Sequence, residues 1–211
     1  IPSFAVGRTQ DLIYYLGRFY QEGRLPQQAV FLDSPMAIRA NAIYSRFHDQ
    51  FAATDRAALA AKGVKRIEDW LPILRCTPTA EESMAINRIK SGAIIIAGAG
   101  MCNGGRIRHH LRHNLWRPNC DVIFAGYQAQ GTPERAIQVH GPGGGYVELD
   151  GERYKVGAKI TTIGGYSAHA DQKGLLGFVT RMRHWPSDIR IVHGDAAAKL
   201  NLAERFKAYY E

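Results

Sequence analysis

Residues 93–120, AIIIAGAGMCNGGRIRHHLRHNLWRPNC, form the stretch that decides the fold. The apolar, β-branched run at its start predicts a buried strand, and the glycines that follow predict a tight turn. Beyond the turn, Ile107, Leu111 and Leu115 recur at helical spacing and predict the apolar face of a helix. A strand, a turn and a helix in this order are typical of α/β proteins, in which crossover helices connect parallel strands.

The same alternation continues on both sides of this stretch. Further strand-like runs occur at 29–32, 121–125 and 190–192, and helical patterns occur at 11–22, 35–51 and 106–115. We therefore expect an α/β fold with a parallel sheet and crossover helices.

The sequence changes character near residue 141, where glycines become frequent. Residues 147–163, VELDGERYKVGAKITTI, then alternate apolar and polar positions around Asp150-Gly151, which predicts an antiparallel hairpin. Helices are predicted beyond it at 173–182 and 197–209. We expect a second structural unit to start near residue 141.

Composition and charge restrict the class of protein. With 211 residues and 45% hydrophobic content the chain can bury a core, and it has no apolar run near the roughly 20 residues that a membrane-spanning helix needs. The formal net charge is +8, and most of the positive residues are arginines, which pair bidentately with phosphate. The charge favours an anionic partner such as a nucleic acid and gives no reason to expect a membrane.

The N-terminal sequence and the cysteines indicate the compartment. IPSFAVGRTQ has no charged leader, long apolar stretch or initiator methionine, so we expect no signal peptide and a start inside a larger protein. The three cysteines, Cys76, Cys102 and Cys120, are odd in number and lack CxxC spacing. A reducing cytoplasmic location is expected.

The glycine turn and the helix after it are candidates for phosphate contact. Glycines allow close approach to the backbone, and a helix opening near Gly105 and Arg106 offers amide groups to an anion. Residues 103–120 contain four arginines, three histidines and no acid, with Arg108 and Arg112 on one helix face. His109 and His113 have the spacing of metal ligands, but the neighbouring arginines disfavour a cation. The glycines match neither the dinucleotide nor the Walker pattern.

A second candidate phosphate contact is Ser34, in the segment Asp33-Ser34-Pro35 after a strand-like run. Ser34 can cap the helix that Pro35 opens, and the amides there would attract an anion. A simple helix cap explains the residue equally well.

Two histidines lie in small polar clusters near the C-terminal end of the chain. YSAHAD contains Ser167, His169 and Asp171, and VHGD contains His193 and Asp195. Histidine exchanges protons near neutrality and binds zinc, so these are candidates for a general acid and a metal ligand. The alternatives are structural histidines, with Asp171 as the cap of the helix after it.

Six motifs together carry a family resemblance. FAVGRTQ, DSPMA, GMCNGGRI, GYQAQGT, YSAHAD and VHGD occur in the order found in the β-CASP group of metallo-β-lactamase-fold nucleases. The chain resembles this group over nearly its whole length. The resemblance implies that residues 1–145 are the β-CASP domain and that residues 146–211 are the C-terminal part of the metallo-β-lactamase αββα domain.

The resemblance also implies roles for individual residues. His169 takes the position of the general acid that protonates the leaving group, and His193 takes the position of a zinc ligand. Contacts to RNA are implied for residues within the motifs, namely Ser167, Arg106, Gly105, Ser34 and Arg8, and we expect Arg108 and Arg112 to add to them.

The sequence departs from the family pattern in several places. The HxHxDH zinc signature is absent from these residues, GTPERAIQ is poorer in glycine than the family pattern, and Asp195 replaces a glutamate. The resemblance implies that the parent protein is a zinc-dependent ribonuclease with two zinc ions. Because the zinc signature is absent from these residues, this part alone is expected to be inactive, to bind zinc incompletely and to require the missing N-terminal lactamase half.

Two other functions are compatible with the residues. One is a non-catalytic RNA-binding module of the same fold, and the other is a small-molecule enzyme on a nucleotide-binding sheet, which the missing phosphate-loop signatures disfavour. Apolar surface exposed where the missing half would pack also predicts self-association into a homo-oligomer.

Overall fold

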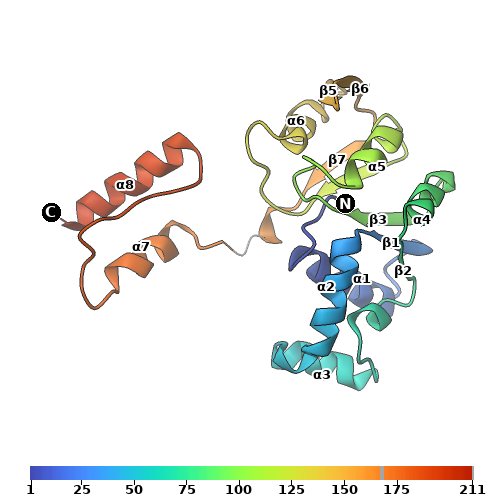
Figure 1. Ribbon diagram of the computed structural model, residues 1–211, viewed down its shortest axis with the longest axis horizontal. Helices are drawn as coiled ribbons and strands as arrows, with labels where there is room; N and C mark the ends of the chain where they lie inside the picture. Colours follow the sequence, from blue (N-terminus) through green and yellow to red (C-terminus); the bar gives the residue numbers. More distant parts are fainter. Residues whose placement is uncertain (167–168, 211) are drawn as a thin grey trace. The chain divides into compact units, whose positions relative to one another are not determined.

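The computed structural model describes residues 1–166 and 169–210 of the chain (Figure 1). Contacts between Cα atoms divide the chain into two compact units, Ile1–Tyr166 and Ser167–Glu211. The first unit contains all the strands found in the described residues.

A three-stranded parallel sheet forms the centre of the first unit, with β1 between β2 and β3. The register pairs Ala29 with Ala93 and Asp33 with Ala97, so β1 and β3 end side by side. All five residues of β1 are buried, as expected for a strand covered on both faces. The predicted α/β fold is confirmed; the strands are β1 (Ala29–Asp33), β2 (Leu74–Cys76) and β3 (Ala93–Ala97).

Three of the six α-helices of this unit begin at a residue whose side chain caps the helix. Ser34 and Thr132 each cap a helix whose first residue is proline, and Thr79 forms a capping box with Glu82. The α-helices are α1 (Arg8–Gln21), α2 (Pro35–Arg46), α3 (Ala53–Ala61), α4 (Ala80–Ala85), α5 (Ile107–Asn114) and α6 (Pro133–His140). Short 3-10 helices are η1 (His48–Gln50), η2 (Ile67–Trp70), η3 (Ile86–Arg88) and η4 (Gly164–Tyr166).

Two smaller strand pairs complete the first unit (Figure 1). The predicted hairpin is confirmed: Asp150 and Gly151 both have positive φ, 57° and 77°, as a type I′ turn requires. The parallel pair is β4 (Asp121–Phe124) with β7 (Lys159–Thr162), and the antiparallel hairpin is β5 (Tyr146–Leu149) with β6 (Glu152–Lys155).

Two large apolar clusters form the core of the first unit. One surrounds α5, where Ile107, Leu111 and Leu115 are buried against residues of β4 and of the β5–β6 hairpin, which confirms the predicted helix face. The other joins α1 to the central sheet. The strands after residue 145 therefore contribute to the core of the first unit, and the predicted domain boundary between residues 145 and 146 stays a prediction.

The second unit contains two α-helices in its described residues, α7 (Gln172–Thr180) and α8 (Ala196–Tyr210), close to the predicted positions. The predicted strand at 190–192 is wrong, because these residues have no strand structure and Val192 is 71% exposed. An isolated strand leaves its N–H and C=O groups unpaired, and no strand of this unit is available among the described residues to pair with it. No helix in the described part of the chain is long and apolar enough to cross a membrane.

Candidate functional site

Two of the sequence motifs meet at the carboxyl edge of the central sheet, the DSPMA segment after β1 and the glycine-rich turn after β3. β1 and β3 end next to each other, so Ser34 and Gly98 begin neighbouring turns. A Cβ atom added to Gly98 would lie 3.3 Å from Oγ of Ser34 and 3.8 Å from the carbonyl oxygen of Ser3. The carboxyl edge of a parallel sheet is where open α/β folds bind ligands.

A buried carboxylate, Asp33, organises this edge. Its side chain is fully buried and lies at hydrogen-bond distance from four side chains of three other segments. Oδ1 accepts from the Thr77 hydroxyl at 2.7 Å and from Nη1 of Arg106 at 2.7 Å. Oδ2 accepts from the Ser83 hydroxyl at 2.6 Å and lies 2.6 Å from Nε2 of His110. The network ties α4 and α5 to the end of β1.

The hydrogen bonds determine the ionisation of Asp33. Burial by itself would raise the pKa of this carboxyl group, but the hydrogen bonds, that of His110 foremost, outweigh burial and hold the pKa well below its usual range. Asp33 is therefore a permanent negative charge opposite the Arg106 guanidinium at neutral pH.

Arg106 is held in place by three protein oxygens. Besides Asp33, Nη1 donates to the carbonyl of Thr77, and Nη2 donates to the carbonyl of Pro78 at 2.9 Å. Its side chain is 21% exposed. Both terminal nitrogens are thus engaged at the sheet edge. The predicted contact of Arg106 with RNA stays a prediction, and an RNA phosphate there would share the arginine with Asp33.

The glycine-rich turn requires glycine at Gly105. This residue has a φ of +72°, and a Cβ atom there would lie 2.3 Å from the carbonyl oxygen of Gly98. Among the described residues, the backbone N–H groups of Asn103, Gly104 and Gly105 donate to no protein acceptor. Asn103 and Gly105 are exposed and Gly104 is partly buried, so the turn borders solvent, and neighbouring amides without a protein acceptor are groups that suit an anion.

Ser34 and Arg8 have local partners. Oγ of Ser34 accepts from the N–H of Ala37 at 3.3 Å, which confirms that it caps α2. Arg8 begins α1 and forms an ion pair with Asp11 at 3.1 Å. Their contacts with RNA stay predictions.

Arg108 and Arg112 face the hairpin turn. Arg108 pairs with Asp150, and Arg112 lies 3.7 Å from both Asp150 and Glu152. Nε of Arg112 also donates to the hydroxyl of Tyr154 at 2.9 Å. Acidic side chains therefore neutralise part of the positive field of α5 that the sequence indicates.

Sequence reasoning missed His110. The helical spacing indicates His109 and His113 as a candidate metal-ligand pair, and both are exposed. His110, between them, is buried and contacts Asp33. Its position three residues after Ile107, on the apolar face, was the available signal. Thr77 and Ser83 gave no such signal, because their proximity to Asp33 arises only from the tertiary fold.

Glu134 is a second buried carboxyl group, in the segment that departs from the family pattern. It is fully buried beside the buried thiol of Cys102. Burial raises the pKa of Glu134 to about 7 and raises the pKa of Cys102 as well. This carboxyl group therefore titrates near neutral pH.

The C-terminal histidines lie in exposed positions. Ser167 lies outside the described residues, His169 precedes α7, and His193 has a φ of +63° in the turn before α8. Asp171 caps α7, since its Oδ1 accepts from the N–H of Gly174 at 2.7 Å. The roles of His169 and His193 stay predictions.

The described residues do not fit a zinc centre by themselves. Within residues 1–166 and 169–210, no group of three or more His, Cys, Asp or Glu side chains is placed so that it could hold a metal ion. His193 is a single prospective ligand, and a structural or catalytic zinc ion needs at least three protein ligands.

Two family models match the chain. The Beta-Casp domain matches residues 9–137, and the Zn-dependent metallo-hydrolase RNA specificity domain matches residues 153–211. The first match contains the Asp33 network and the glycine-rich turn, and the second contains both C-terminal histidines.

The relatives of the chain are longer proteins. Ribonuclease TTHA0252 of Thermus thermophilus is 36% identical over 206 residues, which are 97% of this chain and 44% of that protein. Transcription termination factor FttA of Methanosarcina mazei is 30% identical over 96% of the chain and 32% of that protein. FttA of Thermococcus kodakarensis is 31% identical over 96% of the chain and 31% of that protein. The chain spans less than half the length of these relatives.

The Beta-Casp match covers more than half of the chain and contains the motifs that meet at the carboxyl edge of the sheet. By this match, the chain belongs to the β-CASP family.

Proposed function

We propose that this chain is the RNA-recognition part of a ribonuclease that hydrolyses RNA phosphodiester bonds. The observation that carries the proposal is the carboxyl edge of the central sheet. There the backbone N–H groups of residues 103–105 have no protein acceptor among the described residues, and the turn that contains them is followed by Arg106, which Asp33 anchors. A set of neighbouring amides without protein acceptors suits a phosphate group, which is an anion with several acceptor oxygens.

Charge and family support RNA as the ligand. The chain carries a net charge of +8, which favours a polyanion over a neutral substrate. The second matching family is described as an RNA specificity domain, and one relative is named a ribonuclease. The names of the FttA relatives also point to a process that acts on RNA transcripts.

The catalytic part of the proposal concerns the whole protein. His169 is proposed to protonate the leaving oxygen, and Ser167 to contact the RNA phosphate. His193 is proposed as one ligand of a zinc centre in the parent, whose remaining ligands come from outside this chain. The chain alone is proposed to be inactive, with residues 1–145 as the β-CASP domain, residues 146–211 as lactamase-domain sequence and the cytoplasm as its location.

A cleavage assay tests this proposal. Labelled single-stranded RNA would be incubated with zinc and four proteins: this chain, the chain rejoined to its upstream sequence, and the rejoined His169→Ala and His193→Ala variants. Cleavage by the rejoined wild type only is expected. The His193→Ala protein should have lost zinc, measured by elemental analysis, and the His169→Ala protein should have kept it.

Two results would contradict the assignment. Equal cleavage by all the rejoined proteins would remove the catalytic roles of both histidines. RNA binding that weakens with salt, without cleavage by the rejoined wild type, would favour a non-catalytic RNA-binding module of the same fold.

A further inference from the structure

The FAVGRTQ motif brings an exposed aromatic side chain to the glycine-rich turn. Phe4 is 50% exposed, which is unusual for an aromatic residue beside a sheet. A Cβ atom added to Gly100, in the turn after β3, would lie 2.7 Å from Cδ2 and 2.9 Å from Cε2 of the Phe4 ring. The ring therefore lies directly against the turn, and glycine at position 100 leaves the space that the ring occupies.

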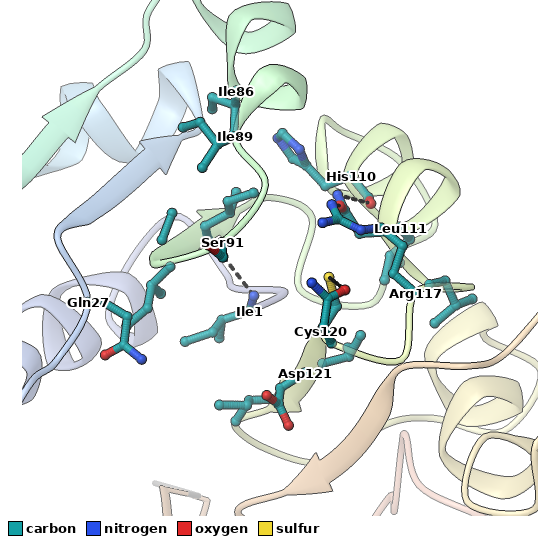
Figure 2. Close-up of a pocket in the computed structure, with 18 of the residues that line it drawn as sticks. Ile1, Gln27, Ile86, Ile89, Ser91, His110, Leu111, Arg117, Cys120 and Asp121 are labelled. Carbon is teal, nitrogen blue, oxygen red and sulfur yellow. Dashed lines mark hydrogen bonds between the residues drawn. The ribbon is translucent and has the colours of Figure 1, made fainter.

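The chain on the N-terminal side of Phe4 is fixed along β3. The nitrogen of Ile1 donates to the carbonyl of Ile95 at 2.7 Å (Figure 2). The N–H of Ser3 donates to the carbonyl of Ala97, the last residue of β3, at 2.9 Å. Phe4 follows Ser3 directly, so the sheet places it where β3 ends and the turn begins.

Hydrogen bonds from α1 fix the chain on the other side of Phe4. The carbonyl of Phe4 accepts from the N–H of Thr9 at 3.3 Å and from its hydroxyl at 2.7 Å. Oε1 of Gln10 accepts from the N–H of Gly7 at 2.7 Å, and Nε2 of Gln10 donates to the carbonyl of Ala5 at 3.1 Å. Thr9 and Gln10 are both buried. The loop thus holds Phe4 in a defined place, and a ligand on the ring would lose little affinity to ordering of the loop.

The neighbourhood of the ring suits a nucleotide. Gly100 belongs to the same turn as the amides of residues 103–105, which have no protein acceptor among the described residues. The N–H of Ala99 donates to the carbonyl of Gly104 at 3.2 Å, so the two arms of the turn lie side by side. Groups that suit an anion and an exposed aromatic ring are therefore neighbours. Proteins that bind single-stranded nucleic acid combine such a site for the backbone with aromatic rings on which bases stack.

We infer that Phe4 binds RNA by stacking its ring on an unpaired base next to the phosphate at the glycine-rich turn. The inference rests on the proposed function and adds a base contact to its phosphate contact. The net charge of +8 and the amides beside the ring favour RNA over an apolar protein surface as the occupant. Every base has a flat face, so the contact tolerates any base. It requires a single strand, because specific contact with the faces of bases needs unstacked nucleotides.

Fluorescence anisotropy with two labelled oligonucleotides tests this inference. One is oligouridylate, and the other is an abasic RNA of the same length, which keeps the phosphates and riboses but lacks the bases. Phe4→Leu keeps an apolar side chain but removes the ring, and should weaken binding of oligouridylate about tenfold while leaving binding of abasic RNA unchanged. Phe4→Tyr keeps a flat ring and should bind both within about twofold of the wild type. Val6→Ala, at a neighbouring side chain that is 63% exposed, is the matched control and should change neither.

The outcomes separate this inference from the proposed function. Equal affinities of the wild type and Phe4→Leu for oligouridylate, with Asn103→Asp still weakening it, would overturn the base contact and leave the proposed function in place. Equal weakening of both oligonucleotides by Phe4→Leu would also overturn the base contact, because Phe4 would then act through the fold of the turn. RNA binding that neither Phe4→Leu nor Asn103→Asp changes would overturn the proposed phosphate contact together with this inference.

Discussion

The two units of the chain differ in how much of their own core they contain. Residues 1–166 bury two large apolar clusters and a charged network centred on Asp33. In the second unit, Val179 and Phe206 are the buried apolar side chains among the described residues, whereas Phe178 is 71% exposed and Leu200 is 65% exposed. The apolar clusters and the charged network of the first unit form from contacts within this chain. The second unit has few buried apolar side chains, and the roles of His169 and His193 within it stay predictions.

The largest expected effect comes from removing the central charge of the first unit. Asp33→Ala leaves Arg106 and His110 without their carboxylate partner in a buried place, and should lower the free energy of unfolding by about 4 kcal/mol. Urea denaturation followed by fluorescence measures this value. Asp49→Ala, at a side chain that is 79% exposed, is the control and should change little. A loss of less than about 1 kcal/mol for Asp33→Ala would show that the network does not organise the unit.

A smaller loss is expected at the glycine-rich turn. Gly105→Ala combines a positive φ with a Cβ atom 2.3 Å from the Gly98 carbonyl, and should cost at least about 2 kcal/mol. The matched control is Gly104→Ala, because a Cβ atom at that position meets no atom within 4 Å. Denaturation midpoints of the two variants provide the comparison. Equal midpoints would mean that the turn adapts to either side chain.

Glu134 makes the first unit sensitive to pH. Burial raises its pKa from 4.5 to about 7, so the folded state holds a proton that the unfolded state releases between these values. Stability from this group is therefore present below pH 4.5 and is lost as the pH rises through 7. Glu134→Gln should stabilise the protein by about 2 kcal/mol at pH 8 and have little effect at pH 4. Thermal unfolding of both proteins at the two pH values measures the difference, and an equal effect at both would contradict it.

The smallest effect is expected in the second unit. Asp171→Ala removes the cap of α7 and should cost about 1 kcal/mol of local helix stability. Hydrogen exchange of the α7 amides should accelerate, while the unfolding midpoint of the first unit stays the same. A matched shift in the stability of the first unit would show that the two units unfold together and would contradict their independence.

Much of the fold was predictable because its signals are local. The strand runs at 29–32 and 93–97, the hairpin at Asp150-Gly151 and the apolar face of α5 all follow from short-range patterns. The strand at 190–192 was predicted from the same kind of pattern and is wrong, since a β-strand depends on a neighbouring edge that its own sequence does not contain.

The candidate site was predictable only in part. Arg106 and Gly105 stood out because a glycine turn after a strand is a recognisable motif. The carboxylate that anchors Arg106 was seen only as part of a helix-capping motif, and its other partners come from distant segments. The ion pairs of Arg108 and Arg112 with the hairpin turn could not be predicted from the sequence of α5, because Asp150 is distant in the sequence and approaches α5 only in the folded chain.

The central claim is that the carboxyl edge of the central sheet binds RNA. The most direct test is fluorescence anisotropy of labelled single-stranded RNA at several salt concentrations, with the wild-type chain, Asn103→Asp and Gln50→Glu. Both substitutions replace an exposed amide by a carboxylate, but only the first lies beside the unengaged amides of the turn. The account predicts that Asn103→Asp weakens binding about tenfold and Gln50→Glu less than about twofold. Equal losses in the two variants would contradict it.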